Sequence, residues 1–197
     1  HSENFYSILA HIPGIKVVTP SDAYTVRGLL AASIRDDDPV MVCNHKKLIN
    51  LSSFVPDESY AIELGKGRRI REGSDVTLIG MSWTTEVCKN AADQLGADGI
   101  SCDVIDLLSI SPLDEEIFLE SVSKTHRVVV VDEDTPRASM ASEIAAVIVD
   151  QAFDELDAPV KRVTGPHTPV PYSKPLETAF IPDEAAVIAT TKKLLNI

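Results

Sequence analysis

The sequence feature that most constrains the fold is the run of four valines at residues 128–131, which ends at Asp132. A short apolar run bounded in this way is typical of a strand that is buried on both faces of a parallel sheet. Similar runs alternate with helical periodicity from residue 75 onward, which indicates an α/β domain. The predicted strands are residues 76–79, 102–105, 128–131 and 160–163, and the predicted helices are residues 84–95, 141–153 and 183–195.

The first 44 residues follow the same pattern but supply only two predicted strands, at residues 15–18 and 39–43. A predicted helix separates them, and Ser21 or Asp22 is placed to cap its first amides. We therefore expect residues 1–44 to be the end of a domain whose beginning is missing.

Two segments need a separate interpretation. Residues 45–75 are mixed in composition and show no sustained period, so we interpret them as an interdomain connection that ends in a turn at residues 68–73. Further along, Ser111-Pro112 is predicted to open a short helix, with the proline at a tolerated position in the first turn. Residues 76–197 then form a complete, small, doubly wound domain.

Composition narrows the classes of partner and compartment. The longest apolar runs are far shorter than the about 20 residues that cross a bilayer, so no membrane association is expected. The formal net charge of −12 disfavours nucleic acid and suits a basic protein partner or a bound cation, although solubility alone also explains it. Three cysteines without a CxxC pair indicate reduced thiols in a cytosol-like compartment.

Common catalytic motifs are absent from the sequence. The only GxG, at residues 65–67, has Ile70 where a dinucleotide-binding fingerprint needs its third glycine, so we interpret it as a turn. The sequence contains no Walker A motif, no HExxH, no zinc-ligand spacing and no nucleophile elbow. The residues alone therefore predict no self-sufficient active site.

Two acidic clusters are candidate sites. The first, residues 36–38, follows the helix of the first unit, where carboxylates face the negative end of the helix dipole. Asp36 and Asp38, with carbonyl groups near the helix end, are suited to a cation, but a solvated loop neutralised by Arg35 is the alternative. The second cluster, residues 132–134, follows the valine strand, where open α/β sheets place ligands. Its simpler role, which we favour, is to stabilise the start of the next helix.

Five histidines are scattered through the chain, and their spacing marks none as catalytic. His167 lies in a segment with three prolines in six residues, which stiffen the chain. Such a segment is suited to presenting His167 or Tyr172 at an interface, and a rigid connection between strand and helix explains the prolines equally well. The histidines are His1, His11, His45, His126 and His167.

Motifs along the whole chain are collinear with those of a known family. They are His1-Ser2, residues 11–21 (HIPGIKVVTPS), 28–30 (GLL), 34–40 (IRDDDPV), 71–77 (REGSDVT), 104–107 (VIDL), 111–114 (SPLD), 163–165 (VTG) and 192–197 (KKLLNI). In these motifs the chain resembles the C-terminal part of the β subunit of thiamine-diphosphate-dependent E1 components of 2-oxo-acid and acetoin dehydrogenases. Residues 166–171 (PHTPVP) are most similar to acetoin dehydrogenase β subunits, and the pyruvate enzyme is the main alternative.

The resemblance implies a domain order and a reaction. Residues 1–44 would be the end of a pyrimidine-binding, transketolase-like domain, residues 45–75 the linker, and residues 76–197 a transketolase C-terminal domain. The reaction would be acetoin cleavage or decarboxylation of pyruvate or a branched-chain 2-oxo acid, with acyl transfer to E2 lipoamide. Two alternatives stay open: a docking and dimerisation module without catalysis, and another transketolase-like thiamine enzyme such as deoxyxylulose-phosphate synthase.

The resemblance also implies roles for particular residues. His1 matches the family histidine that reaches the reactive end of the cofactor and assists acyl transfer. A family potassium-binding loop matches Ser33, Ile34, Asp36 and Asp38. The glutamate that activates thiamine diphosphate belongs upstream of His1, and the GDG motif for the diphosphate and Mg²⁺ belongs to the α subunit and does not occur here. We therefore expect this chain alone to be inactive.

The expected partners are proteins of a multienzyme complex. They are the E1 α subunit, a second β subunit and the basic subunit-binding domain of the E2 acyltransferase. The resemblance places Asp157 and the terminal carboxylate of Ile197 where the E2 domain docks, and the acidic surface suits a basic partner. The expected location is the cytoplasm, with the mitochondrial or plastid matrix as the alternative.

Overall fold

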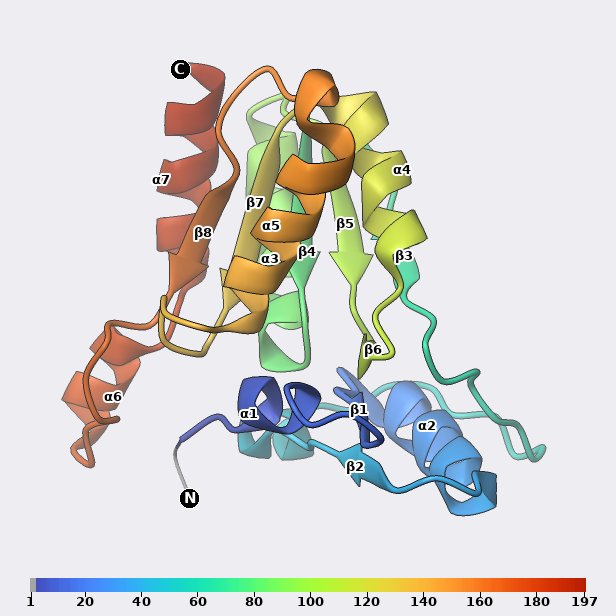
Figure 1. Ribbon diagram of the computed structural model, residues 1–197. Coiled ribbons are helices and arrows are strands. Elements are labelled where there is room, and N and C mark those ends of the chain that lie inside the picture. The colour runs from blue at the N-terminus through green and yellow to red at the C-terminus, as the bar shows by residue number, and fades with distance from the viewer. Residues whose placement is uncertain (1–2) are drawn as a thin grey trace.

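The computed structural model describes residues 3–197, which form a large and a small α/β unit (Figure 1). The large unit contains a five-stranded sheet in the order β3-β5-β4-β7-β8. All neighbouring strands are parallel except β3, which is antiparallel to β5. The strands are β3 (Arg68–Arg71), β4 (Val76–Gly80), β5 (Cys102–Asp106), β7 (Val128–Asp132) and β8 (Lys161–Thr164).

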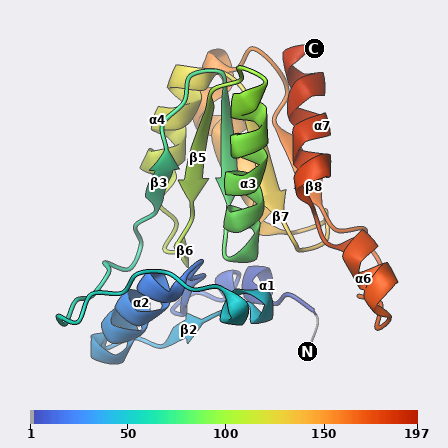
Figure 2. The same ribbon diagram turned by 180° about the vertical axis from the view of Figure 1, so that it is seen from behind.

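Helices cover both faces of this sheet. In Figure 1 the helices α4 (Glu115–Thr125) and α5 (Met140–Ala152) lie in front of the sheet. Figure 2 shows α3 (Trp83–Ala97) and α7 (Glu184–Leu195) on the opposite face. The valines of β7 are fully buried between the two helical layers, as the apolar run predicts. The predicted doubly wound α/β domain is confirmed.

The small unit is built on β1 (Lys16–Val18) and β2 (Val40–Val42), which are parallel and joined through α2 (Ala23–Arg35). Asp22 begins the helix as predicted, because its side chain accepts a hydrogen bond from the amide of Thr25 at 2.7 Å. A short helix, α1 (Tyr6–Ala10), precedes β1. None of the helices within residues 3–197 is long and apolar enough to cross a membrane.

The sequence pattern misses one strand that joins the two units. Residues 109–111 form β6 (Ser109–Ser111), which pairs antiparallel with β1, so the small sheet has the order β2-β1-β6. The predicted helix start at Ser111-Pro112 is therefore wrong, and α4 begins only after Asp114. The reason is a contact distant in sequence: Ser111 Oγ donates to the carbonyl of Ile15 at 3.0 Å, and no local pattern reveals this partner.

A second strand lies inside the predicted connection. Residues 68–71, predicted as a turn, form the edge strand β3. An arginine-rich segment has little strand character of its own, and here ion pairs to buried carboxylates hold it in place. Arg69 Nε lies 3.1 Å from Asp103 Oδ1 in the neighbouring strand β5. Two further elements that the pattern misses are the 3-10 helix η1 (Lys46–Asn50) and α6 (Lys174–Phe180), which has no buried residue.

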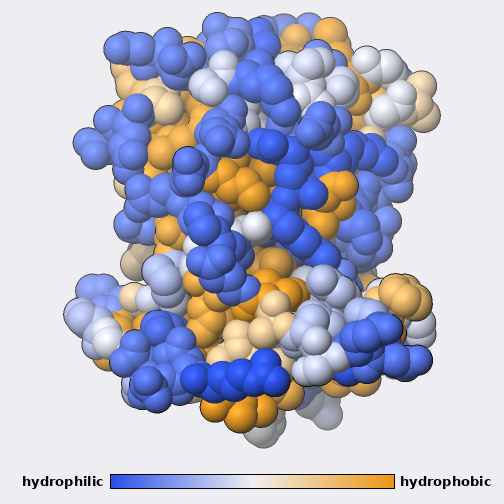
Figure 3. Space-filling view, turned by 90° about the vertical axis from the view of Figure 1, so that its right-hand side faces the viewer, coloured by the Kyte–Doolittle hydropathy of each residue, from blue (hydrophilic) through white to orange (hydrophobic). Residues whose placement is uncertain are grey.

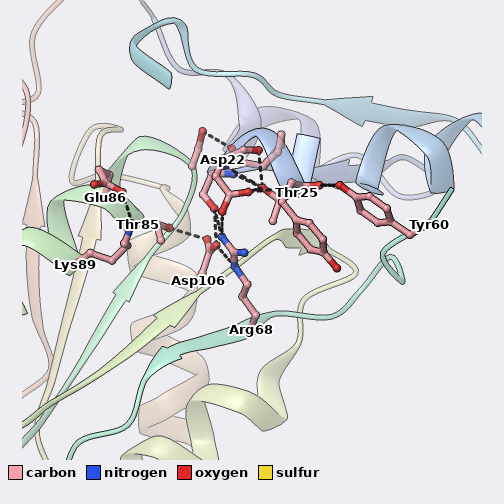
Figure 4. A network of polar contacts seen from close by, with 12 residues as sticks. Asp22, Thr25, Tyr60, Arg68, Thr85, Glu86, Lys89 and Asp106 are labelled. Atoms are coloured by element: carbon pink, nitrogen blue, oxygen red, sulfur yellow. Dashed lines mark hydrogen bonds and ion pairs between the residues drawn. The ribbon is translucent and has the colours of Figure 1, made fainter. Parts of the chain in front are cut away.

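A buried polar network joins the two units, as Figure 4 shows around Arg68. The guanidinium of Arg68 lies 2.6 Å from Asp22 Oδ2 in the small unit and 2.9 Å from Asp106 Oδ2 in the large unit. Asp106 is fully buried and also accepts hydrogen bonds from Ser21 Oγ at 2.5 Å and Thr85 Oγ1 at 2.7 Å. Burial raises the pKa of Asp106, and the charge of Arg68 opposes this shift. Arg68 is thus the cation that compensates a buried carboxylate at the joint.

Apolar surface is concentrated on the small unit. In Figure 3 the orange surface is more continuous in the lower half, where the small unit lies, than over the large unit. Leu30 and Ile34 of α2 are among the exposed apolar side chains, with Met41 of β2 and Phe54 of the connection. Contiguous apolar surface of this kind is a common property of faces that other chains cover.

Candidate functional site

The carboxyl ends of β4 and β7 are where an open α/β sheet places its ligands. These strands are neighbours, but the chain leaves β4 toward α3 on one face and leaves β7 toward α5 on the other. Such a switch point opens a crevice that ligands occupy in open α/β sheets. The ends of both strands point toward the small unit (Figure 1), and residues of both units, such as Cys43 and Trp83, line a cavity there.

Two adjoining cavities, of about 400 and 330 Å³, lie at this crevice. Both are lined by Glu3, Asn4 and Glu133. The larger cavity extends over the residues after β4 and over the start of the connection, and the smaller one extends along the segment after β8. The further lining residues that matter below are Tyr6, His45, Lys46, Lys47, Trp83 and Glu177 in the larger cavity, and Asp134, Thr135 and His167 in the smaller.

Asp132, the last residue of β7, is a buried carboxylate satisfied by three donors. The hydroxyl of Tyr6 donates to its Oδ1, which also accepts from the amide of Asp134 at 3.0 Å. Its Oδ2 accepts from the amide of Ala141 in the first turn of α5 at 3.0 Å. The predicted stabilisation of the next helix is therefore confirmed for Asp132, and the loop that follows it also lines the cavities.

Glu133 binds the connection between the units. Its Oε2 lies 2.8 Å from His45 Nε2, and His45 Nδ1 accepts from the amide of Lys47 at 3.2 Å. The contact between His45 and Glu133 is a close approach of two groups that pair when the imidazole is charged, and not an aligned hydrogen bond, since Glu133 Oε2 has no hydrogen-bond partner among the described residues. The ring of His45 stacks on Trp83 with centroids 6.0 Å apart, and Lys47 Nζ lies 4.9 Å from the centre of the Trp83 ring.

The pKa of Asp132 gives a test of this geometry. Burial raises its pKa from the ordinary 3.8 to about 6. A raised folded-state pKa means that the stabilising contribution of this group is full below about pH 4 and is lost as the pH rises through about 6. The shift corresponds to about 3 kcal/mol in total, of which about half falls between pH 5 and 7.5.

We therefore expect the difference in unfolding free energy between the native chain and Asp132→Asn to change by about 1.5 kcal/mol between pH 5 and 7.5, in favour of the native chain at pH 5. Urea unfolding at several pH values measures it. Asp98→Asn is the control, because Asp98 is exposed and pairs only with Lys192 at the surface. A difference for Asp132→Asn that is flat across this range would contradict the assignment.

The acidic cluster at residues 36–38 is neutralised by Lys16 rather than by Arg35. Lys16 Nζ lies 2.8 Å from each carboxylate oxygen of Asp36 and 3.1 Å from Asp38 Oδ2. The hydrogen bonds with Asp36 raise the pKa of Lys16, and those with Lys16 lower the pKa of Asp36. The compensating cation, Lys16, lies on β1. It is close to Asp36 in space although the two residues are 20 positions apart in the sequence.

This arrangement limits how the loop would hold a potassium ion. The carboxylates of Asp36 and Asp38 already engage Lys16, so the available ligands are main-chain carbonyl oxygens. The carbonyl of Ser33 accepts the amide of Asp36 at 3.4 Å, which is a weak hydrogen bond. Potassium binding by the loop that includes Ile34 stays a prediction.

The other predicted site residues lie far from the crevice or outside the described residues. His1 belongs to residues 1–2, which lie outside the described part of the chain. The C-terminal end, at Ile197, lies at the opposite, amino edge of the sheet, at the top of Figure 1. Asp157 lies beside the start of β7, where its amide donates to the carbonyl of His126 at 2.9 Å. There Asp157 pairs with Arg127 at 3.0 Å, and the side chain of Ile197 is 74% exposed. E2 docking at these residues stays a prediction.

Sequence reasoning misses Tyr6, His45 and Glu133 as parts of one site. The position of Glu133 directly after the strongest strand is a usable signal, because such loops carry ligand-binding residues. His45 lies in a segment without periodicity, and nothing in the sequence connects it with Glu133. Tyr6 has no signal at all, since its partner Asp132 is 126 residues away.

The described residues do not supply a metal centre or a diphosphate cradle. No group of three or more histidine, cysteine, aspartate or glutamate side chains within residues 3–197 is gathered to hold a metal ion. Three carboxylates, from Glu3, Glu133 and Glu177, line the larger cavity together with Lys46 and Lys47, so its lining offers no net positive charge to a diphosphate. The residues of this crevice therefore do not fit the diphosphate end of thiamine diphosphate.

The sequence matches two family descriptions in order. Residues 1–52 match "Transketolase, pyrimidine binding domain" and residues 65–187 match "Transketolase, C-terminal domain". The chain is 44% identical, over 196 residues, to the β subunit of acetoin:2,6-dichlorophenolindophenol oxidoreductase of Bacillus subtilis. It is 42% identical, over 194 residues, to the pyruvate dehydrogenase E1 component subunit beta of Rickettsia conorii.

These alignments cover 100% and 98% of this chain but only 57% and 60% of the relatives. The chain thus spans less than two thirds of the length of the curated relatives that it matches. Among solved structures it is similar to a chain described as "Split gene transketolase, inactive beta4 tetramer", with a TM-score of 0.80 and 26% identity. That similarity covers 96% of this chain and 60% of the solved one.

Proposed function

We propose that this chain, which belongs to the transketolase C-terminal domain family, is part of the β subunit of a thiamine-diphosphate-dependent E1 component. The reaction is cleavage of acetoin, or decarboxylation of a 2-oxo acid as the second candidate, with the acyl group passed to lipoamide. The observation that carries the proposal is the 44% identity to an acetoin oxidoreductase β subunit over the whole chain. Pyruvate dehydrogenase β subunits follow at 39–43% and a 2-oxoisovalerate dehydrogenase β subunit at 40%, so the class is better supported than the substrate.

In this proposal the chain supplies one wall of a shared active site. When bound, thiamine diphosphate would supply the electron sink for the reaction, and the α subunit would hold its diphosphate and Mg²⁺. His1 is the proposed catalytic residue, since an imidazole exchanges protons near neutral pH. The lining of the larger cavity supports this division, because its three carboxylates outnumber its two lysines and leave no net positive charge for a diphosphate.

The proposed partners are an α-type subunit, a second β subunit and the basic docking domain of an E2 acyltransferase. The exposed apolar side chains of the small unit support contact with other subunits. The net charge of −12 and the exposed chain end at Ile197 support a basic partner at the amino edge, near Asp157. Main-chain carbonyls of Ser33, Ile34, Asp36 and Asp38 are the proposed potassium ligands.

The proposed location is the cytoplasm, or an organelle matrix as the alternative. The free thiols of Cys43, Cys88 and Cys102 support a reducing compartment. A relative from Ascaris suum is described as mitochondrial, which keeps the second location open. The chain as a docking module without catalysis is the second function, and the lack of a diphosphate cradle favours it for the isolated chain.

The test is an assay of the full-length protein assembled with its α-type subunit, thiamine diphosphate and Mg²⁺. Reduction of 2,6-dichlorophenolindophenol is followed with acetoin, pyruvate and 2-oxoisovalerate in turn. We expect turnover that needs both subunits and is fastest with acetoin. Faster turnover with pyruvate would reassign the substrate, and no turnover with any of the three would contradict the proposed function.

The isolated 197-residue chain gives a complementary prediction. Calorimetric titration with thiamine diphosphate and Mg²⁺ should detect no tight binding, because the crevice offers no net positive charge to the diphosphate. The assembled α/β protein is the control and should bind the cofactor under the same conditions. Micromolar, Mg²⁺-dependent binding to the isolated chain would show that the division of labour between the subunits is wrong.

A further inference from the structure

The three acidic residues at the carboxyl end of β7, Asp132, Glu133 and Asp134, contact three different side chains of the N-terminal part of the chain. We call them the acidic clasp. Asp132 accepts from the hydroxyl of Tyr6, and Asp134 Oδ2 accepts from Ser7 Oγ at 2.7 Å. Glu133 holds His45 at 2.8 Å, as described above. The simple role of stabilising α5 accounts for a fourth contact, from the amide of Ala141 to Asp132, and does not explain these three.

The contacts of α1 are built into the large unit. The side chain of Tyr6 is only 4% exposed and packs in the same core cluster as Ile79 and Val130. Ser7 Oγ donates to Asp134 and also accepts from the amide of Met140 at 3.2 Å. Two consecutive side chains of α1 are therefore bound to the start and the end of the same loop.

A helix of five residues has no stability of its own. Helix nucleation is unfavourable, and isolated helices shorter than about 12 residues are marginal in water. The placement of α1 (Tyr6–Ala10) therefore depends on the bonds that Tyr6 and Ser7 make with the clasp. The placement of the segment before α1 depends on the same bonds. Among the described contacts, the side chain of Glu3 has one hydrogen bond, which its Oε1 accepts from the amide of Val170 at 3.1 Å, in the segment after β8.

This segment is the wall that the two cavities share. Glu3 and Asn4 line both cavities, and Phe5 and Tyr6 line the larger one. The proposed catalytic residue, His1, precedes Glu3 by two positions in the sequence. A displacement of α1 would therefore change the shape of both cavities. It would also shift the point from which the chain continues back to His1.

We propose that Asp132 and Asp134 are positioning residues, which act through Tyr6 and Ser7 to hold α1 and residues 3–5, the segment that follows His1 and Ser2 in the sequence, in the wall of the crevice. This inference rests on the proposed function. It adds two residues of the C-terminal domain to the residues that set the geometry of the reaction. Misplacement of a reacting group by about 1 Å can cost on the order of 100-fold in rate, so modest loosening of α1 has a measurable effect.

The test is Tyr6→Phe in the full-length protein assembled with its α-type subunit. The substitution keeps the ring in the core and removes only the hydroxyl that binds Asp132. We expect kcat for acyl transfer to fall about 10-fold, with KM for the acyl donor and the Kd for thiamine diphosphate within about twofold of the native values. Ser7→Ala, which spares the core, should reproduce the effect in weaker form.

A double-mutant cycle separates positioning from a general loss of structure. If Tyr6 acts through His1, Tyr6→Phe has no further effect in a His1→Ala background. Hydrogen exchange on the isolated chain is an independent readout, and Tyr6→Phe should speed exchange of the α1 amides while β4 and β7 stay protected. Tyr60→Phe is the matched control, because its hydroxyl binds only the carbonyl of Tyr24 far from the crevice.

The outcomes are distinguishable. If the losses of kcat are additive in the cycle, the positioning role is wrong and the proposed function is unaffected. The same holds if Tyr6→Phe keeps the native kcat while His1→Ala lowers it. An assembled native protein without turnover, or one indifferent to His1→Ala, would overturn the proposed function itself. Faster α1 exchange, together with a loss of kcat that disappears in the His1→Ala background, is the result that supports both.

Discussion

Replacement of Arg68 by methionine is expected to lower the free energy of unfolding by about 3–5 kcal/mol. Arg68 is the partner of Asp106, a fully buried carboxylate, and it also binds Asp22 across the joint between the units. Methionine fills a similar volume but leaves the carboxylate of Asp106 without a compensating charge. Removal of one member of a buried pair costs far more than the pair itself contributes.

Urea unfolding measures this loss, and its pH dependence identifies the cause. The pKa of Asp106 is already raised by burial and rises further without Arg68. A raised folded-state pKa lowers the free energy of unfolding as the pH rises, because the buried carboxylate then has to ionise. Arg68→Met should therefore cost less free energy of unfolding at pH 5 than at pH 8. The opposite trend would mean that the damage is due to lost packing.

Arg71→Met is the matched control for this prediction. Arg71 lies on the same strand and pairs with Asp93, but both side chains are largely exposed to solvent. An exposed pair contributes at most about 1 kcal/mol. Equal losses for Arg68→Met and Arg71→Met would show that burial of Asp106 does not govern the stability of the joint.

Gly73→Ala is the second substitution with a large expected effect, a loss of at least about 3 kcal/mol or failure to fold. Because β5 lies between β3 and β4 in the sheet, the chain must cross over the start of β5 at residues 72–75. A Cβ on Gly73 would lie 2.1 Å from the carbonyl carbon of Cys102 and 2.4 Å from the amide nitrogen of Asp103. Both neighbours are main-chain atoms of a central strand and cannot move aside.

The crossing is also tied to β5 by hydrogen bonds. The amides of Ser74 and Asp75 donate to the carbonyl of Ser101 at 3.2 and 2.9 Å. A methyl group at Gly73 would lift the crossing and break these bonds. Loss of the β3–β5 pairing should then appear as rapid amide exchange in β3 (Arg68–Arg71), and protected exchange there would contradict the mechanism.

Gly96→Ala, the same chemical change, should have the opposite sign. Gly96 lies in α3 with an exposed position, and a Cβ there would meet only Arg71 Nη1 at 4.0 Å. Alanine in a helix is favoured over glycine by about 0.5–1 kcal/mol. Chemical denaturation of the two variants side by side therefore separates close packing of the crossing from a general effect of added methyl groups.

The predictable part of the fold is the part whose signal is local. The strand β7 and the periodic helices around it can be recognised from sequence windows of about a dozen residues. The strands β3 and β6 do not, because the first is held by ion pairs to Asp103 and Asp106 and the second by pairing with β1. Neither interaction is visible without the partner strand.

The site divides in the same way. The acidic residues after β7 are notable from the sequence because of where the strand ends. The residues that they bind, Tyr6, Ser7 and His45, come from segments without a distinctive pattern. The cluster at residues 36–38 attracts attention for its charge, yet the sequence does not identify Lys16 as its partner.

The pairing of β6 with β1 has a consequence for how the protein is made. Val17 of the small unit pairs with Ser111, a residue that the ribosome adds only after β4, α3 and β5. The small sheet therefore cannot be completed while the N-terminal unit leaves the ribosome. Its strands β1 and β2 are synthesised first and can pair with β6 only after most of the large unit has been added. Closing so long a loop is entropically costly and slow, so the two units should fold together, in one late and cooperative event.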